Sequence, residues 1–495
     1  MERAAPQSRW GHWPAFFLVA LIGLSIRLPQ LGARPIHTDE AVNAYIVGQL
    51  LAGESFTYDS QDRHGPALAA LALPLVKIQG ARSFSDLTEA ELRLSPILAG
   101  TVTILLFGAA AELFGCMPSL LAALLFAVAP LPVYYDRYFI HESLLCAATF
   151  GLILSGCHAV KTRSLRQAAA AGACSALMFA CKETAILHWF ALAAAALVFC
   201  VRNRRLKSLL GSLPLGPLLA AAGTFMVLLI ILFTGFGRNR SALAVLSQVV
   251  PQILARAAGQ GHQKSVWYYG GLLTGGWSGG LLLALACLGF LISIRKREPP
   301  PWRLLSWYAL FIVLIYSLIP YKTPWLALNL FLPLALLAAK AVESLWRLAA
   351  EKLSAREAVA ASCILAVLAG VLIARDTRKR AFLQPANETN PYAYAQTSED
   401  ILGLAPELAD LARRSGMSNP RTAVIASDPW PLPWYLRHFS QVGYWQPGQQ
   451  VAEADFYITS TEVANQYADR LRNFRPEFFG VRPGVLILLW SRDPE

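Results

Sequence analysis

The chain has 495 residues, of which 55% are hydrophobic and only 15% are charged, and its mean hydropathy is +0.44. This composition is too apolar for a soluble globular protein of this length, so it indicates an integral membrane protein. The net charge of +12 does not indicate a nucleic-acid partner, because Lys and Arg gather in short loops between apolar runs, where membrane topology explains them.

Apolar runs along the chain are candidates for membrane-spanning helices. The first, at 13–31, follows a short basic N-terminus and has no cleavage site after it, which predicts an uncleaved signal anchor with a cytoplasmic N-terminus. The others lie at about 66–80, 96–114, 118–134, 142–160, 166–181, 185–201, 214–235, 271–294, 303–319, 325–343 and 357–374.

Basic loops at 161–166, 202–207 and 295–303 predict which ends of these helices face the cytoplasm. All three should lie on the side of the N-terminus, so an even number of spans must precede residue 161. The weakest run, 66–80, is therefore predicted to lie at or dip into the outer face. About eleven transmembrane helices remain, and residues 32–95 become one large external loop.

This external loop holds several carboxylates beside the bilayer. Ionisable groups are costly there, so they indicate a functional site. Thr38 is predicted to be the N-cap of a helix that runs to about Leu51, which places Asp39 and Glu40 in its first turn. The helix dipole favours ionised carboxylates at that end, so Asp39 would be available as a base or a cation ligand. The competing interpretation is an acidic first turn on a solvated loop helix.

Two further polar turns are predicted on the same external side. Arg63 and His64 end the first loop just before a Pro-initiated helix, where they would bind an anionic head group or simply lie on the surface. Arg137, with tyrosines on either side, suits a phosphate or a sugar, although a snorkelling Arg in an interfacial aromatic belt is the alternative. That alternative does not explain Glu142, which opens the next span.

Lys182 and Lys322 are the remaining external cations of interest. Lys182 is followed by Glu183 between two apolar runs, so the two residues would bind substrate or form a self-neutralising pair at a helix end. Lys322 follows Tyr321 and is the only charge between Arg303 and Lys340 in the sequence. It would present a cation to a lipid phosphate, or snorkel at the interface as an ordinary Lys.

From residue 376 the chain becomes polar and rich in Pro. Strand patterns occur at 422–426, 456–459 and 485–490, and helical patterns near 398–415 and 462–473. An odd number of spans places this α/β domain, 376–495, on the extracytoplasmic side, after a transmembrane domain at 1–375 that includes the external loop.

Motifs for soluble nucleotide-sugar chemistry do not occur in the sequence. There is no Walker A loop, no GxGxxG after a strand and no HExxH. Because the polar groups are predicted to face outward, they cannot use cytoplasmic nucleotides. A donor would have to arrive in the membrane.

Several of these motifs together resemble a known family. The Asp39-Glu40-Ala41 motif, Gly65-Pro66 at a helix start, 92–96 (LRLSP) and 137–145 (RYFIHESLL) resemble the type-C glycosyltransferases related to protein O-mannosyltransferases and to the aminoarabinose transferase of lipid A. The set HTDEA, HGP, KETA, YKTPW and the tail segment WPLPWY is most similar to a prokaryotic subfamily called flippase-activity-associated proteins. The resemblance covers about 30–345 and part of the tail.

The resemblance implies roles for individual residues. Asp39 would be the base that deprotonates the acceptor while a sugar leaves a polyprenyl phosphate with inversion, and Glu40 would be its neighbour. His64 stands where the aminoarabinose transferase has a Lys, and Glu142 where the mannosyltransferases have an Asp. The further candidates for binding the donor phosphate or substrate are Lys322, Arg137, Arg63, Tyr321 and Lys182. No metal is implied as essential, although a divalent cation is compatible with the family.

The sequence therefore predicts a polytopic α-helical membrane protein with the type-C glycosyltransferase fold and a small extracytoplasmic α/β domain. The predicted activity is transfer of a hexosyl or pentosyl group from a polyprenyl-phosphate-sugar lipid to a lipid, glycan or protein, at the outer face of the cell (inner) membrane. The alternative is a flippase or transport-associated component that moves a lipid-linked sugar without breaking a bond. A transporter should carry ionisable groups near the bilayer midplane and often an internal repeat, whereas here the charges cluster at one face.

Overall fold

The computed structural model describes residues 11–59, 63–203, 214–235, 237–239, 242–245, 251, 262–275 and 277–492. The chain forms two compact units, which we describe separately. The helical unit comprises Met1–Pro29, Ser55–Ala72 and Arg93–Leu383, and the sheet unit comprises Gln30–Glu54, Leu73–Leu92 and Gln384–Glu495. The predicted external loop is thus divided between the two units, and the helical unit continues past the predicted boundary at residue 375.

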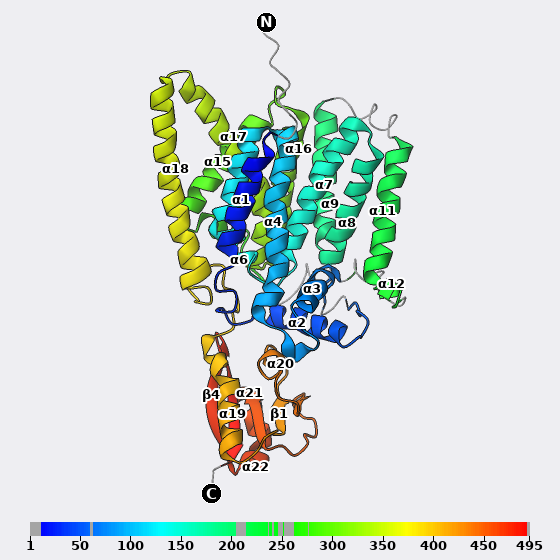
Figure 1. Ribbon diagram of the computed structural model, residues 1–495, viewed down its shortest axis with the longest axis vertical. Helices are drawn as coiled ribbons and strands as arrows, with labels where there is room; N and C mark the ends of the chain where they lie inside the picture. Colours follow the sequence, from blue (N-terminus) through cyan, green and yellow to red (C-terminus); the bar gives the residue numbers. More distant parts are fainter. Residues whose placement is uncertain are drawn as a thin grey trace. The chain divides into compact units, whose positions relative to one another are not determined.

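The helical unit contains most of the apolar helices (Figure 1). They are α1 (Trp13–Arg27), α4 (Glu89–Phe114), α5 (Cys116–Val128), α6 (Pro130–Tyr135), α7 (Glu142–Thr162), α8 (Leu165–Cys181), α9 (Ala185–Arg202), α11 (Leu215–Phe233), α12 (Ala242–Val245), α14 (Tyr268–Thr274), α15 (Trp277–Ser293), α16 (Pro300–Leu318), α17 (Ala327–Ala350) and α18 (Ala355–Arg378). A short 3-10 turn at Pro324–Leu326 precedes α17, and a short π turn at Lys379–Leu383 follows α18. The α4 helix begins in the sheet unit.

Within the described ranges, seven helices are long and apolar enough to cross a membrane, or eight if the bent pair α14 and α15 counts as one span. This confirms a polytopic helical membrane protein. The predicted total of about eleven also includes the shorter helices α1, α5 and α8, of 15, 13 and 17 residues. The weakest predicted run forms α3 (Ala67–Ile78), whose 12 residues would extend only about 18 Å, too short for a hydrocarbon core of about 30 Å.

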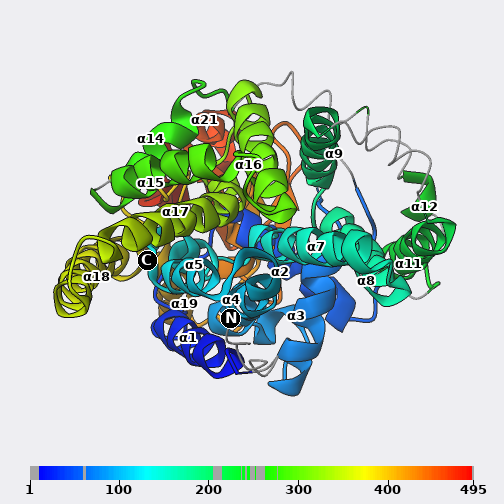
Figure 2. The same ribbon diagram turned by 90° about the horizontal axis from the view of Figure 1, so that it is seen from above.

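The α17 helix is the centre of the helical unit. Every residue from Ala327 to Ala341 is buried, as expected for a helix that is hydrophobic around its whole circumference. Figure 2 shows α5, α15 and α16 around it, and all three contact it. By contrast, few or none of the residues in the apolar stretches of α11 and α18 are fully buried, which suits helices that also face lipid.

The predicted span 118–134 is two helices, because α5 ends at Val128 and α6 begins at Pro130. Ala129 adopts an extended conformation (φ −67°, ψ 146°), as expected for a residue before proline, where the α region is sterically disfavoured. Arg27 of α1 fills the break. Its buried guanidinium donates to the carbonyl oxygens of Phe126 and Ala127 at 3.0 and 2.8 Å, and its Nε donates to Asp136 Oδ2 at 2.9 Å.

The predicted span 271–294 is also interrupted, since α14 and α15 are bent by 112°. Gly275 ends α14 in an extended conformation (ψ 93°). Glycine has low helix propensity, and the glycines at 270, 271, 279 and 280 flank this position. The sequence pattern of apolar residues does not reveal such a bend, because both helices remain apolar.

Close backbone packing joins α15 to α17 at Gly289, and we predict that Gly289→Ala destabilises the protein. A Cβ atom at this position would overlap the backbone carbonyl of Leu337, which cannot move as a flexible side chain would. Small residues permit such close helix contacts in membrane proteins. We expect a fall of several degrees in the melting temperature of the purified protein. Gly280→Ala is the matched control, because its Cβ would meet no atom within 4 Å; equal melting temperatures for the two variants would contradict the prediction.

The sheet unit contains a five-stranded sheet with the order β2-β1-β3-β5-β4. The strands are β1 (Thr422–Ile425), β2 (Val442–Trp445), β3 (Phe456–Ser460), β4 (Phe474–Arg482) and β5 (Val485–Arg492). The first three are parallel, and β5 is antiparallel to both β3 and β4. The three strands predicted from the sequence are found as β1, β3 and β5.

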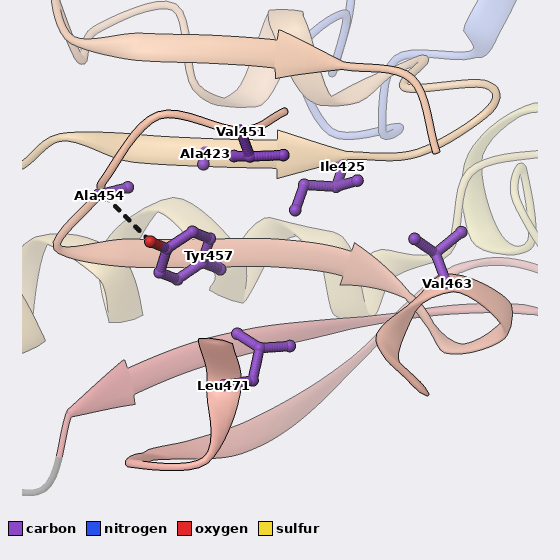
Figure 3. Packing of buried hydrophobic residues seen from close by; sticks show 7 residues of the cluster. All are labelled: Ala423, Ile425, Val451, Ala454, Tyr457, Val463 and Leu471. Carbon is purple, nitrogen blue, oxygen red and sulfur yellow. Dashed lines mark hydrogen bonds between the residues drawn. The ribbon is translucent and has the colours of Figure 1, made fainter. Parts of the chain in front are cut away.

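Helices and turns of the same unit are α2 (Thr38–Leu51), η1 (Phe84–Asp86), η5 (Glu399–Gly403), α19 (Leu404–Arg414), α20 (Leu432–Tyr435), α21 (Thr461–Ala464), η6 (Asn465–Tyr467) and α22 (Ala468–Leu471). Its core includes Ala423, Ile425 and Tyr457 (Figure 3). The Tyr457 hydroxyl satisfies a buried backbone group by accepting from Ala454 N at 3.1 Å, so the aromatic ring lies in the core without an unpaired hydroxyl.

Candidate functional site

The α2 helix, which carries the predicted base, begins with a histidine cap. The prediction of Thr38 as N-cap is wrong, because His37 holds that position and Thr38 is the first helical residue. The Nδ1 atom of His37 accepts from Asp39 N at 3.0 Å, and the Glu40 carboxylate accepts from His37 N at 3.0 Å. This is a capping box in which an imidazole nitrogen replaces the usual hydroxyl. Asp39 and Glu40 lie in the first turn, as predicted.

His37 is a neutral acceptor toward Asp39. Its Nε2 lies 3.1 Å from the carbonyl oxygen of Tyr394, so it must donate there while Nδ1 accepts. Burial lowers the pKa of His37, outweighing the opposite effect of Asp39 and Glu40. The imidazole therefore orients the helix start without neutralising the Asp39 charge.

Asp39 and Glu40 differ sharply in their surroundings. The Asp39 side chain is 47% exposed, and within the described residues its carboxylate accepts no hydrogen bond. Glu40 is fully buried and lies 3.6 Å from Arg34 Nη2 while it caps the helix. Asp39 is thus available to a reacting group, whereas Glu40 is committed to holding the loop.

The C-terminal segment of the sheet unit fixes the residues just before Asp39. The Tyr435 hydroxyl accepts from Ile36 N at 3.1 Å, and Gln396 donates to the Pro35 carbonyl at 3.0 Å. Together with the bond from His37 to Tyr394, these contacts join two parts of the chain that are more than 350 residues apart. The helix start that carries Asp39 is therefore positioned by the tail.

A second polar cluster lies in the helical unit around Glu183. His64 Nδ1 donates to Glu183 Oε2 at 2.9 Å, and the Tyr58 hydroxyl donates to Oε1 at 2.7 Å. Burial alone raises the pKa of Glu183, but the adjacent His64 and the two hydrogen bonds outweigh this effect and lower it to about 2. The His64 side chain remains 29% exposed. The Glu183 carboxylate thus holds the partly exposed His64 ring in a defined orientation.

Lys182 and Glu142, both predicted as substrate-binding residues, form an ion pair beside this cluster. Lys182 Nζ lies 2.5 Å from Glu142 Oε1, and both side chains are buried. The nearby His141 ring lies 5.1 Å from the His64 ring, measured between centroids. The structure thus brings together His64, Glu142 and Lys182 from three separate parts of the sequence.

Arg137 and Lys322 are placed elsewhere in the helical unit, where both donate to backbone carbonyls. Arg137 is buried, donates to the carbonyl oxygens of Pro29 and Ala381 at 2.5 and 2.7 Å, and lies over the Phe382 ring. Lys322 is buried and donates to the carbonyl oxygens of Ile319 and Lys264 at 2.5 and 3.3 Å. The carbonyls of Pro29 and Ile319 lie just beyond the ends of α1 and α16, where helices leave such groups unsatisfied.

Tyr321 and Arg63 complete the predicted set. Tyr321 is half-buried beside Lys322 and pairs with Gln263 through an isolated β-bridge. Arg63 is half-buried, and within the described residues its guanidinium makes no hydrogen bond or ion pair. Arg238 and Arg240 are two further arginines that the sequence predicts on the external side; Arg238 is exposed, whereas Arg240 lies outside the described residues. The predicted convergence of Asp39 with Lys322 and Arg137 stays a prediction, since they belong to different units.

We predict that acidification destabilises the protein through His141 and Glu183. Burial, followed by the charges of His64 and Lys182, holds the pKa of His141 well below its ordinary value of 6.5. The unfolded chain binds this proton below about pH 6.5, so the stabilisation is complete above that value and is lost as the pH falls. Glu183 adds a further loss of stability as the pH falls from the ordinary pKa of its carboxyl group, 4.5, to the folded-state pKa of about 2.

The measurement is the melting temperature of the purified protein between about pH 7.5 and about pH 5. We expect it to fall with pH, and to fall less in His141→Asn than in the wild type. Thr162→Ser is the control, because Thr162 is an exposed residue at the other end of α7 without a titratable group, so this variant should leave the slope unchanged. A wild-type slope in the His141→Asn variant would contradict this assignment.

Comparisons with known proteins agree with this architecture. Residues 77–233 match the family model described as dolichyl-phosphate-mannose-protein mannosyltransferase. The crystal structure of ArnT from Cupriavidus metallidurans bound to undecaprenyl phosphate is similar, with a TM-score of 0.67 and 16% identity, over 97% of this chain and 98% of that chain. No curated protein matches the sequence.

Two further solved structures share the fold. The archaeal oligosaccharyltransferase AglB from Archaeoglobus fulgidus, in complex with an inhibitory peptide and a dolichol-phosphate, has a TM-score of 0.56 and 13% identity, over 99% of this chain and 75% of that chain. The arabinofuranosyltransferase AftD from Mycobacteria has a TM-score of 0.51 and 15% identity, over 99% of this chain and 40% of that chain.

The helical unit and the small sheet define a polytopic membrane protein with the type-C glycosyltransferase fold. The family model matches residues 77–233, and the solved structures share the fold of the chain at 13–16% identity. The closer resemblance to the flippase-activity-associated subfamily stays a prediction.

Proposed function

We propose that this protein is a glycosyltransferase that moves a sugar from a polyprenyl-phosphate-linked donor to an acceptor on the extracytoplasmic face of the cell membrane. The observation that carries the proposal is Asp39, an exposed carboxylate without a hydrogen-bond donor among the described residues, in the first turn of a helix fixed by the tail. The whole chain shares its fold with a structure of ArnT that is bound to undecaprenyl phosphate.

In the proposed reaction Asp39 acts as the general base. The acceptor hydroxyl gives its proton to the Asp39 carboxylate while its oxygen forms a bond to C1 of the sugar. The bond between C1 and the phosphate oxygen breaks, and the polyprenyl phosphate leaves with that electron pair. A single displacement of this kind inverts the configuration at C1. The lipid phosphate is a good leaving group, so the protein mainly positions the reactants and stabilises the developing charge.

For the donor phosphate, we propose His64 and Arg63 ahead of the other predicted cations. His64 is partly exposed and is oriented by its hydrogen bond to the Glu183 carboxylate, and Arg63 adds an adjacent guanidinium. Charge-assisted hydrogen bonds from such groups suit a phosphate. Lys182, Arg137 and Lys322 are engaged by Glu142 or by backbone carbonyls, so in this role they would first have to exchange those partners.

We propose no essential metal ion. Full activity after treatment with EDTA would agree with this prediction, whereas activity that is lost and returns only on addition of a divalent cation would contradict it.

The proposed orientation has a cytoplasmic N-terminus and an extracytoplasmic sheet unit. Labelling of engineered surface cysteines in sealed membranes would test this orientation.

The decisive experiment is an assay of the purified protein in lipid nanodiscs against a panel of polyprenyl-phosphate sugars, following release of the lipid phosphate. We expect release with one class of sugar and inversion at C1 in the product. Transbilayer movement of the lipid-linked sugar with no bond cleavage, for every donor tested, would instead support the flippase-associated alternative.

A further inference from the structure

The parallel part of the sheet has a topological switch point beside the Asp39 helix start. In the order β2-β1-β3-β5-β4, the chain leaves β1 toward β2 on one side. It leaves β3 toward β4, which lies on the other side. The connections that leave β1 and β3 therefore diverge, and ligands of open α/β sheets bind at such points, outside the carboxyl ends of the strands. The segment 427–431 follows β1 and so begins at this edge of the sheet.

Asp428 lies in this segment and is held in a defined orientation. Its Oδ1 accepts from Trp430 N at 3.2 Å, and its Oδ2 pairs with Arg482 Nη2 at 3.1 Å. Arg482 ends β4, which runs in the same direction as β3 because β5 is antiparallel to both. The carboxylate and the guanidinium therefore meet at one edge of the sheet.

A register shift in β4 places Arg482 at this edge. The pairing with β5 is irregular between Gly480 and Arg482, and the Val481 carbonyl accepts instead from Ser398 N at 2.9 Å. Bulges of this kind redirect a side chain and are common beside active sites. The redirected guanidinium also lies 3.4 Å from the Thr38 hydroxyl, one residue before Asp39.

The ion pair is open to solvent and lies near aromatic surface. The Asp428 and Arg482 side chains are 50% and 25% exposed, and an ion pair of this kind contributes little to stability. Trp430 is half-buried and makes an edge contact with Tyr45 of α2, with the ring centroids 5.7 Å apart. Tyr45 is itself 38% exposed.

This combination has the chemistry of a sugar site. Neighbouring hydroxyls of a saccharide both donate and accept, so one would donate to the Asp428 carboxylate while the next accepts from the Arg482 guanidinium. The Trp430 and Tyr45 rings offer an apolar surface to the C–H face of the same ring, as in sites that combine aromatic side chains with a few placed polar groups. A simple anion fits this site less well, because the Asp428 carboxylate would repel it while the Arg482 guanidinium attracts it.

We propose that Asp428, Arg482 and Trp430 form the acceptor subsite of the enzyme and that the acceptor is a saccharide. The inference rests on the proposed function, because it places the acceptor hydroxyl beside the base Asp39. The subsite sets acceptor specificity, whereas donor cleavage does not depend on it.

The test uses purified full-length protein with the donor identified in the panel assay. Three kinds of acceptor are supplied: a set of disaccharides, a peptide with Ser and Thr, and phosphatidylglycerol vesicles. We expect transfer to a disaccharide. Arg482→Gln and Asp428→Asn should raise the KM for it by about tenfold or more, while slow hydrolysis of the donor by water, measured without acceptor, stays at the wild-type rate.

The matched control is Arg421→Gln, which removes another partly exposed Arg–Asp pair, that of Arg421 with Asp455 at 2.8 Å, at the opposite end of β1. It should leave the KM unchanged. An unchanged KM in the Arg482 and Asp428 variants would overturn the subsite, and transfer to the peptide or the lipid instead of a disaccharide would overturn its saccharide chemistry. Absence of any donor turnover in the wild type would refute the proposed function itself, and with it the subsite.

Discussion

Asp39→Asn should abolish sugar transfer while leaving the protein folded. The amide cannot accept the acceptor proton, so we expect turnover to fall by about 10²- to 10⁴-fold, the usual contribution of a general base. The fold should survive, because the Asp39 side chain is 47% exposed and the helix start is capped by His37 and Glu40. The measurement is release of lipid phosphate by the variant in nanodiscs, with its melting temperature recorded in parallel.

The matched control is Glu54→Gln, which removes an exposed carboxylate just beyond the other end of the α2 helix. It should retain wild-type turnover. Full activity of Asp39→Asn at an unchanged melting temperature would exclude Asp39 as the base. Equal loss in both variants would point to the net charge of the loop as the cause.

Arg27→Met should produce the largest loss of stability. Arg27 and Asp136 are both fully buried, and the same guanidinium satisfies carbonyl groups at the break between α5 and α6. Removing one partner of a buried ion pair leaves an uncompensated charge and typically costs about 3–5 kcal/mol. We expect much less protein to be recovered from membranes, and a clearly lower melting temperature for the fraction that folds.

The double variant Arg27→Met/Asp136→Leu should recover part of this loss, since it no longer buries an unpaired carboxylate. Arg375→Met, which replaces an exposed arginine near the end of α18, is the control and should behave like the wild type. A double variant as unstable as Arg27→Met would show that the orphaned carbonyls, and not the Asp136 charge, dominate the effect.

Helix positions were predictable from the sequence, whereas their interruptions were not. Most of the long apolar runs are single helices close to the predicted positions, because runs of this length leave few alternatives, whereas 118–134 and 271–294 are each divided into two helices. The break at Ala129–Pro130 is set by a local steric rule, yet it lies inside an apolar run. It is stabilised by Arg27, a residue about one hundred positions away that no periodicity connects to it.

The sheet unit shows a similar limit. The buried strands β1 and β3 have strong apolar patterns and were predicted, but the edge strands β2 and β4 were not. The β4 strand contains Pro476 and several charged residues, which edge strands tolerate because one side of the backbone needs no partner.

For the candidate site, sequence reasoning identified residue types better than their partners. Asp39 lies in the first turn of a helix as predicted, but the cap is His37, since an imidazole nitrogen can accept as a hydroxyl can. Lys182 was considered as a partner of the adjacent Glu183, whereas it pairs with Glu142, and Glu183 binds His64 and Tyr58. Such exchanges between neighbours depend on which way each side chain turns, and spacing does not determine this.

The hydrogen bonds that fix the Asp39 helix start also constrain how the protein is made. Pro35, Ile36 and His37 leave the ribosome early, but their partners Gln396, Tyr435 and Tyr394 are more than 350 residues further on. At roughly 5–20 residues per second, translation separates the two by tens of seconds. During that interval the first loop lacks the tail residues that order it, so this loop reaches its final geometry only near the end of synthesis.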